Sequence, residues 1–169
     1  MAGRHDWAMA RETISRIDDR LIPLLRRWSV PILRLSLAIV FIWFGALKIF
    51  GTTPVFELVA STVYWVDPDW FVPALGVVEV LVGLGLLFRF GLRLVLAVLF
   101  IQLVGTFLVF VLLPDIAFQG DNPLLLTTEG EFVVKNLVLL AAAMTVGALI
   151  QEKKEEMPTP DQKRHDEAR

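Results

Sequence analysis

The chain has 169 residues, of which 56% are hydrophobic and 20% are charged, with a formal net charge of −2. Soluble domains have about 45–50% apolar and about 25% charged residues, so this composition excludes a disordered chain and favours a membrane protein. The absence of cysteine excludes a disulfide scaffold and iron–sulfur ligation by this chain. His5 and His165 lie near the two ends, so neither a bis-histidine haem nor another metal site is expected. The balanced charge gives no argument for nucleic acid binding.

The first 29 residues predict a helix that lies along the membrane surface. From Trp7 to Trp28, apolar residues recur at alternating spacings of three and four, as on one face of a helix. Pro23 and Pro31 interrupt the pattern, and Pro31 suits the first turn of the segment that follows. We therefore expect a cytoplasmic, interfacial amphipathic helix over residues 1–29, with a short coiled-coil dimerisation seam as the alternative.

Four apolar blocks are long enough to cross a membrane. Each has 18 to 22 residues, which corresponds to roughly 27–33 Å of helix. The blocks are Ile32–Phe50, Phe71–Phe88, Leu92–Leu113 and Phe132–Ile150. Because each block is apolar around its whole circumference, the pattern does not indicate a half-buried amphipathic surface helix. The sequence predicts an all-α integral membrane protein, with a four-helix transmembrane bundle over residues 30–150 and a charged cytoplasmic tail over 151–169.

The basic residues predict the orientation of the bundle. They precede the first span, occur in the turn between the second and third spans, and follow the fourth span. The loops Gly51–Trp70 and Pro114–Glu131 contain no lysine or arginine. By the positive-inside rule, both termini are expected in the cytoplasm and these two loops outside.

Both of these loops carry local structure signals. Phe56–Val66 is apolar enough for a short helix on the outer membrane surface, and Asp67-Pro68-Asp69 is a turn that leads into the second span. Thr128 and Glu131 have the spacing of a capping box before the fourth span.

A few polar residues interrupt the spans: Lys48, Glu79, Gln102, Lys135 and Asn136. Glu79 lies roughly 12 Å below the outer edge of its span, and the two lysines lie within roughly 6 Å of the outer ends of theirs. A charged side chain at this depth costs at least a few kcal/mol, and pairing with an opposite charge makes it tolerable. We predict a polar cluster in the outer half of the bundle. The alternative is that the amides join helices while both lysines extend outward.

The order of these residues resembles the DoxX family of four-span bacterial membrane proteins. The resemblance extends from Arg34 to Gly147. Its motifs are Arg34-Leu-Ser-Leu, Trp43-Phe-Gly-Ala-Leu-Lys48-Ile-Phe-Gly51, Leu75-Gly-Val-Val-Glu79, Gly83-Leu-Gly85, Gln102, Gly105-Thr106, Leu112-Leu-Pro114, Thr128-Glu-Gly130 and Lys135-Asn136. DoxX-like proteins resemble the DoxD subunit of a thiosulfate:quinone oxidoreductase, and other members are associated with membrane redox and oxidative-stress complexes.

The resemblance implies a bacterial inner-membrane protein that serves as a membrane subunit of a quinone-linked redox or oxidative-stress system. Glu79, the candidate catalytic residue, would be a proton acceptor or a polar anchor, with Lys48 and Lys135 as its counter-charges or anion ligands. The pocket would also be lined by Gln102, Asn136 and Trp43. Because the chain has no cysteine and no histidine in its spans, redox chemistry requires a bound quinone or a soluble redox partner subunit.

Other function classes stay open on the sequence alone. They are a small-solute or proton transporter and a structural membrane anchor for soluble partners. Transport predicts an inverted repeat and helices broken at the midplane, and the sequence shows no convincing repeat. Enzymatic activity, at most as an oxidoreductase subunit, and assembly into a homo-oligomer are also left open.

Overall fold

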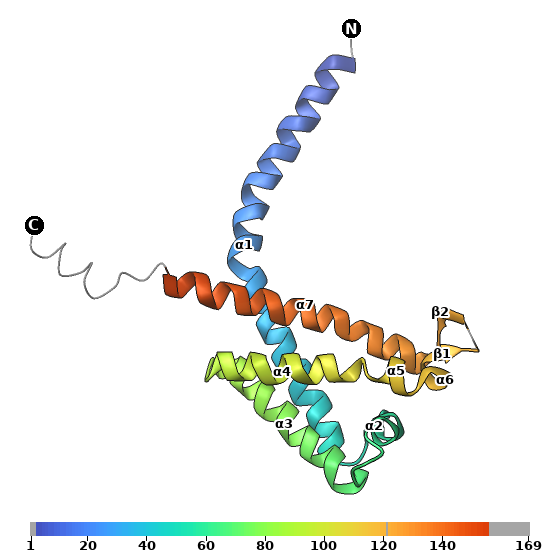
Figure 1. The fold of residues 1–169 in the computed structure, drawn as a ribbon. Coiled ribbons are helices and arrows are strands. Elements are labelled where there is room, and N and C mark those ends of the chain that lie inside the picture. The colour runs from blue at the N-terminus through green and yellow to red at the C-terminus, as the bar shows by residue number, and fades with distance from the viewer. Residues whose placement is uncertain (1–2, 121, 156–169) are drawn as a thin grey trace, which may run out of the picture. The chain divides into compact units, whose positions relative to one another are not determined.

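A computed structural model describes the backbone of residues 3–120 and 122–155 and the side chains of residues 19–120 and 122–148. The chain divides into two units, residues 1–33 and 34–169. The elements, shown in Figure 1, are α1 (Gly3–Ile49), α2 (Phe56–Thr62), α3 (Pro68–Phe88), α4 (Leu92–Thr106), α5 (Val109–Leu112), α6 (Pro114–Ala117), β1 (Phe118–Gln119), β2 (Asn122–Leu126) and α7 (Thr128–Glu155).

Four helical segments are long and apolar enough to cross a membrane, which confirms the expected fold class. They are Asp19–Ile49, Pro68–Phe88, Leu92–Leu112 and Thr128–Ala148. The last three segments lie close to the apolar blocks of the sequence, whereas the first begins at Asp19, well before Ile32. A helix satisfies its backbone groups within the segment itself, as a membrane span requires. At its C-terminal end, α7 continues past Ile150, where the expected span ended, to Glu155.

The separate N-terminal helix expected over residues 1–29 is not present as an element of its own. A single helix runs from Gly3 to Ile49, and both Pro23 and Pro31 lie inside it. A proline removes its own backbone donor and its ring crowds the carbonyl four residues back, which can kink a helix without ending it. The side chains of residues 1–18, which carry much of the expected amphipathic face, lie outside the described residues.

Glycines set the closest approach between α1 and α3 in the second unit. A Cβ added at Gly45 would lie 2.5 Å from the backbone oxygen of Gly76, and one added at Gly76 would lie 2.6 Å from the backbone oxygen of Gly45. Further along, a Cβ at Gly83 would lie 2.8 Å from the backbone oxygen of Ala38. Small residues at these positions let the two backbones pack directly against each other, as in other membrane bundles.

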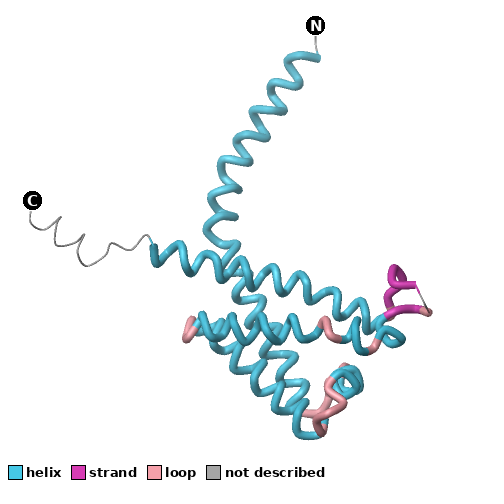
Figure 2. The backbone as a smooth tube through the Cα atoms, in the orientation of Figure 1, coloured by secondary structure: helices cyan, strands magenta, loops and turns pink. Residues whose placement is uncertain are grey.

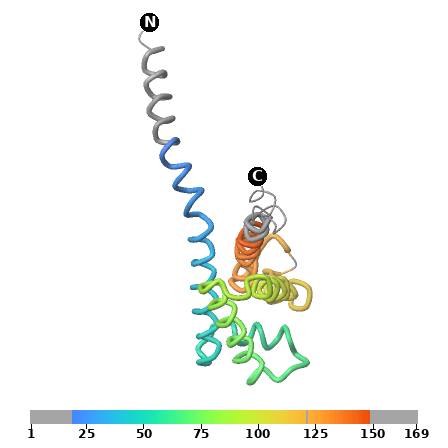
Figure 3. The backbone as a smooth tube through the Cα atoms, turned by 90° about the vertical axis from the view of Figure 1, so that its left-hand side faces the viewer, coloured from blue at the N-terminus to red at the C-terminus, as the bar shows by residue number. Residues whose placement is uncertain are grey.

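The remaining helix contacts close the bundle. α3 packs on α4, and α4 packs on α7, which Figures 1 and 3 place side by side. α7 returns to α1 through Phe44 and Phe132, whose ring centroids are 6.1 Å apart. The four spans therefore surround a common interior.

The third span is interrupted, although the sequence predicted one continuous helix over Leu92–Leu113. α4 ends at Thr106, and Phe107 and Leu108 form a turn before α5. The amides of Phe107 and Leu108 donate to carbonyls three residues back, on Val104 and Gly105, at 3.1 Å each. The hydroxyl of Thr106 donates to the carbonyl of Leu103 at 2.6 Å. These bonds tighten the chain locally and redirect it toward α6.

The short elements gather at one end of the bundle, called the loop end below. Here α2, α5, α6 and the strands lie near the start of α7, while the brief turn after α3 lies at the opposite end (Figure 2). β1 and β2 form an antiparallel hairpin that the sequence analysis did not predict, with Phe118 opposite Leu126. The expected helix over Phe56–Val66 is present as α2, but it ends at Thr62.

Two helix starts can be compared with the sequence signals. Asp67 caps α3 by accepting from the amide of Asp69 at 3.0 Å, with Pro68 in the first turn, as the turn motif predicts. At α7 the expected capping residue is wrong by one position. The Thr127 hydroxyl oxygen accepts from the amide of Gly130 at 3.1 Å, so Thr127, and not Thr128, caps the helix.

Candidate functional site

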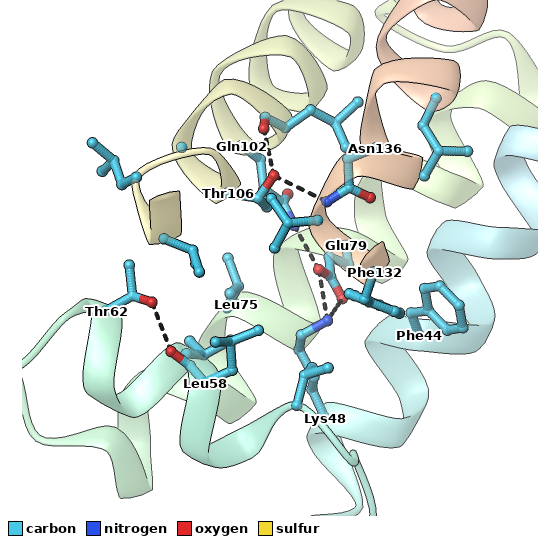
Figure 4. A pocket seen from close by; sticks show the side chains of 18 of the residues that line it. Phe44, Lys48, Leu58, Thr62, Leu75, Glu79, Gln102, Thr106, Phe132 and Asn136 are labelled. Carbon is cyan, nitrogen blue, oxygen red and sulfur yellow. Dashed lines mark hydrogen bonds and ion pairs between the residues drawn. The ribbon is translucent and has the colours of Figure 1, made fainter. Parts of the chain in front are cut away.

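The interior of the bundle contains a cavity of about 270 Å³ toward the loop end (Figure 4). Side chains from all four spans line it, and α2 and α5 contribute further residues. The walls are mainly apolar, and the residues that form them include Val40, Phe41, Phe44, Leu58, Val59, Leu75, Leu103, Val109, Phe132, Val133 and Leu139. A small number of polar groups in an apolar cavity is the usual composition of a small-molecule site.

Lys48, Glu79 and Gln102 form the polar wall of the cavity. The Lys48 ammonium donates to both carboxylate oxygens of Glu79, at 2.8 Å to Oε1 and 2.7 Å to Oε2. The Gln102 amide nitrogen donates to the same Oε1 at 2.6 Å. Lys48 and Glu79 are each only 6% exposed. Pairing with an ammonium and hydrogen bonding by an amide make a buried carboxylate tolerable in an apolar interior.

The glycine contact between α1 and α3 makes this ion pair sterically feasible. A Cβ added at Gly45 would lie 2.9 Å from the Cβ of Glu79, and one added at Gly76 would lie 2.8 Å from the Cβ of Lys48. Each glycine therefore leaves room for the charged residue on the partner helix. Sequence analysis assigned Gly76 to close packing and did not single out Gly45, although each stands three residues before a charged residue.

A second polar pair joins α7 to α4 across the cavity. The Asn136 side-chain nitrogen donates to the Thr106 hydroxyl oxygen at 3.0 Å. Asn136 is 9% exposed, and Thr106 follows Gln102 by one helical turn, so both α4 residues face the cavity. The sequence analysis quoted Thr106 in a motif but gave it no role in the site.

Gln102 retains one unused hydrogen-bonding group among the described residues. Its nitrogen is committed to the Glu79 carboxylate, because a carboxylate can only accept, and this fixes the orientation of the amide. The amide oxygen is buried and has no hydrogen-bond partner within the described part of the chain. A buried polar atom without a partner calls for a functional explanation.

Two of the expected site residues lie away from the cavity. Lys135 does not reach Glu79: its side chain is 74% exposed, and its ammonium lies 3.8 Å from Glu131 on the same helix. Trp43 is 66% exposed, and its neighbour Phe44 lines the cavity instead. Neighbouring helical residues point about 100° apart, and this turn takes Trp43 and Lys135 away from the cavity that Phe44 and Asn136 line. Glu79, Lys48, Gln102 and Asn136 lie together as expected.

A comparison with known protein families matches the part of the chain that carries most of this polar wall. The family model described as DoxX matches residues 29–112. The chain belongs to the DoxX family. The match includes the first three spans, and with them Lys48, Glu79 and Gln102 of the polar wall, but it ends before α7 and Asn136. It is therefore shorter than the resemblance expected from Arg34 to Gly147. No curated protein and no solved structure matches the chain.

Within the described residues, no group of three or more metal-ligating side chains occurs. The polar groups that line the cavity are one carboxylate, one ammonium, two amides and the hydroxyls of threonine.

Proposed function

We propose that the cavity binds the ring of a lipid-soluble quinone and that the protein is a membrane subunit of a quinone-linked redox or oxidative-stress system. The observation that carries the proposal is the buried Lys48–Glu79–Gln102 cluster on the wall of an otherwise apolar cavity. Helix association alone needs neither a cavity nor a deep carboxylate, since amides and small residues are sufficient for it.

The residues present fit a quinone ring. Phe44 and Phe132 offer aromatic surface on one side of the cavity, which suits a flat apolar ring. Its volume of about 270 Å³ is close to the lower end of the range for small-molecule pockets, about 300 Å³. Lys48 supplies an ammonium that would donate to a quinone carbonyl oxygen, and the unused Oε1 of Gln102 would accept from a hydroxyl of the reduced quinol.

Each polar residue has a distinct task in this proposal. A bound quinone would supply two-electron chemistry that is coupled to the transfer of two protons. Glu79 provides a carboxylate that accepts or releases a proton at the cavity wall. Lys48 compensates the charge of Glu79 in its ionised form, and Gln102 holds one carboxylate oxygen in place.

Electrons must come from outside this chain. The sequence has no cysteine, and its two histidines, His5 and His165, are far from the spans in sequence. We therefore include a soluble redox partner subunit in the proposed function.

We further propose that the protein lies in the bacterial inner membrane with both termini in the cytoplasm. The loop end of the bundle carries no lysine or arginine in residues 51–70 and 114–131, whereas Arg89 and Arg93 lie at the opposite end. A fluorescent protein that folds only in the cytoplasm is expected to be bright when fused after Arg169 and dark when inserted within residues 114–131. A dark tail fusion with normal abundance would contradict this orientation.

The Glu79→Gln variant tests the redox role. The amide keeps the size and hydrogen bonding of the side chain but removes the proton-accepting group, so the protein should accumulate normally in the membrane. We expect cells that carry it as their only copy to survive peroxide no better than cells that lack the protein.

Glu57→Gln is the matched control, since it makes the same change at an exposed position on α2. It should leave peroxide resistance unchanged. Full resistance with Glu79→Gln at wild-type abundance would eliminate the proton-transfer role and leave helix packing as the better account of Glu79.

A further inference from the structure

The end of the bundle opposite the loop end carries a second group of polar side chains. α1 and α3 run antiparallel, with Gly45 beside Gly76 and Ala38 beside Gly83. Continuing this register by one turn brings Arg34 on α1 next to the last turn of α3, which ends at the capping residue Arg89. The two positive charges therefore lie at the same end of these two helices.

Arg34 has an unused donor that points to a missing anion. Its Nη1 atom is buried and has no hydrogen-bond partner among the described residues. Placing a buried guanidinium nitrogen near another positive charge without an acceptor is costly, because the buried nitrogen loses hydration and gains no counter-charge. An anion between the two arginines would remove this cost.

The chain has few acidic residues that could serve as this anion. No aspartate or glutamate occurs in residues 20–56, 80–114 or 132–151, which form most of the four spans and the α3–α4 turn. Arg93 adds a third positive charge in the first turn of α4, and no side chain caps that helix. The positive end of the α4 dipole therefore has the same sign as the arginines.

The surface around the arginines is strongly apolar. Phe88 and Phe90 flank Arg89 and are 73% and 82% exposed, and Leu94 is 72% exposed. A ligand that satisfies both features needs an anionic head next to long apolar chains. A free inorganic anion would leave these aromatic side chains uncovered.

We propose that Arg34 and Arg89 bind the phosphate group of an anionic phospholipid, whose acyl chains cover Phe88 and Phe90. Arginine suits this role because its planar fork donates two parallel hydrogen bonds to phosphate oxygens. Basic sites between spans at the cytoplasmic face are a known way for membrane proteins to hold anionic lipids. The site lies at the opposite end of the bundle from the cavity, so it is independent of the proposed quinone chemistry.

Lipid retention by the purified protein tests the proposal. The protein in mild detergent is titrated with phosphatidylglycerol or phosphatidylcholine, and bound lipid is counted by native mass spectrometry. We expect tight retention of phosphatidylglycerol, with binding at least tenfold weaker in Arg34→Gln and in Arg89→Gln, the loss associated with about one charge-assisted bond. Phosphatidylcholine should bind more weakly to the wild-type protein, and an excess of inorganic phosphate should not displace phosphatidylglycerol.

Arg26→Gln is the matched control, because it removes the same charge from an exposed arginine of α1. It should leave phosphatidylglycerol binding within about twofold of wild type. An equal loss in Arg26→Gln and Arg34→Gln would show diffuse attraction and overturn the proposal, as would displacement by inorganic phosphate. Arg89 is exposed, so Arg89→Gln keeps the test decisive if Arg34→Gln fails to fold.

Discussion

Replacing Lys48 by methionine is expected to destabilise the folded protein by about 3–5 kcal/mol, the cost of leaving a buried charge without its partner. Lys48 supplies both of the charge-assisted bonds of the Glu79 carboxylate, at 2.8 and 2.7 Å. Methionine keeps the apolar stem and removes only the ammonium group. Gln102 alone would then have to compensate the carboxylate, and an amide carries no charge.

A double replacement separates the effect of charge from the effect of shape. In the Lys48→Met/Glu79→Gln protein no charge is left in the cavity wall, so most of the lost stability should return. Glu79→Gln alone should be milder than Lys48→Met, because a lysine stem can move its ammonium toward water while a deep glutamate cannot. Stability is followed by thermal unfolding in detergent and by the amount of protein in isolated membranes.

Lys135→Met is the matched control for this experiment. Lys135 is largely exposed, and its contact with Glu131 is long, at 3.8 Å. Exposed pairs of this kind add little to stability, so this variant should behave as wild type. Equal losses from Lys48→Met and Lys135→Met, or no recovery in the double variant, would contradict the assignment of Lys48 as the partner of Glu79.

The fold class could be predicted because it depends on length and hydropathy alone. Each apolar block has the length of a spanning helix, and a helix satisfies its own backbone groups within the membrane. The interruption after Thr106 could not be predicted in the same way. It arises from backbone bonds of Phe107 and Leu108 that tighten one turn, and it leaves the apolar pattern of the sequence unchanged.

In the N-terminal segment, by contrast, the sequence predicted a helix boundary where the structure has a continuous helix. Pro23 and Pro31 favoured a boundary between a surface helix and the first span, because proline often begins or ends helices. The structure has both prolines inside α1. A missing backbone donor lowers the stability of a helix at one point, and the sequence pattern alone does not show whether the neighbouring turns compensate for it.

The candidate site could be predicted in its polar centre but not at its edges. Glu79 needed a partner, and Lys48 and Gln102 were within reach by depth. The errors at Trp43 and Lys135 have one cause: depth along a helix was considered without direction around it. Four-residue spacing from Lys48 and Asn136 leads to Phe44 and Phe132, which are the residues that line the cavity.

The second large effect is expected for Leu75→Trp, which should abolish quinone binding by filling the cavity. Leu75 stands one turn before Glu79 on α3, and it is among the cavity-lining residues. The larger indole occupies the volume that the quinone ring requires, while the polar wall is left intact. Leu81→Trp introduces the same side chain at a 61% exposed position of the same helix, so it controls for the general effect of an added tryptophan.

The measurement that tests the central proposal most directly is the quinone content of the protein purified in mild detergent from native membranes, determined by mass spectrometry. We predict that the wild-type and Leu81→Trp proteins retain quinone and that Leu75→Trp retains at least about tenfold less, at comparable thermal stability. Absence of quinone from the wild-type protein, or equal retention by Leu75→Trp and Leu81→Trp, would contradict the account.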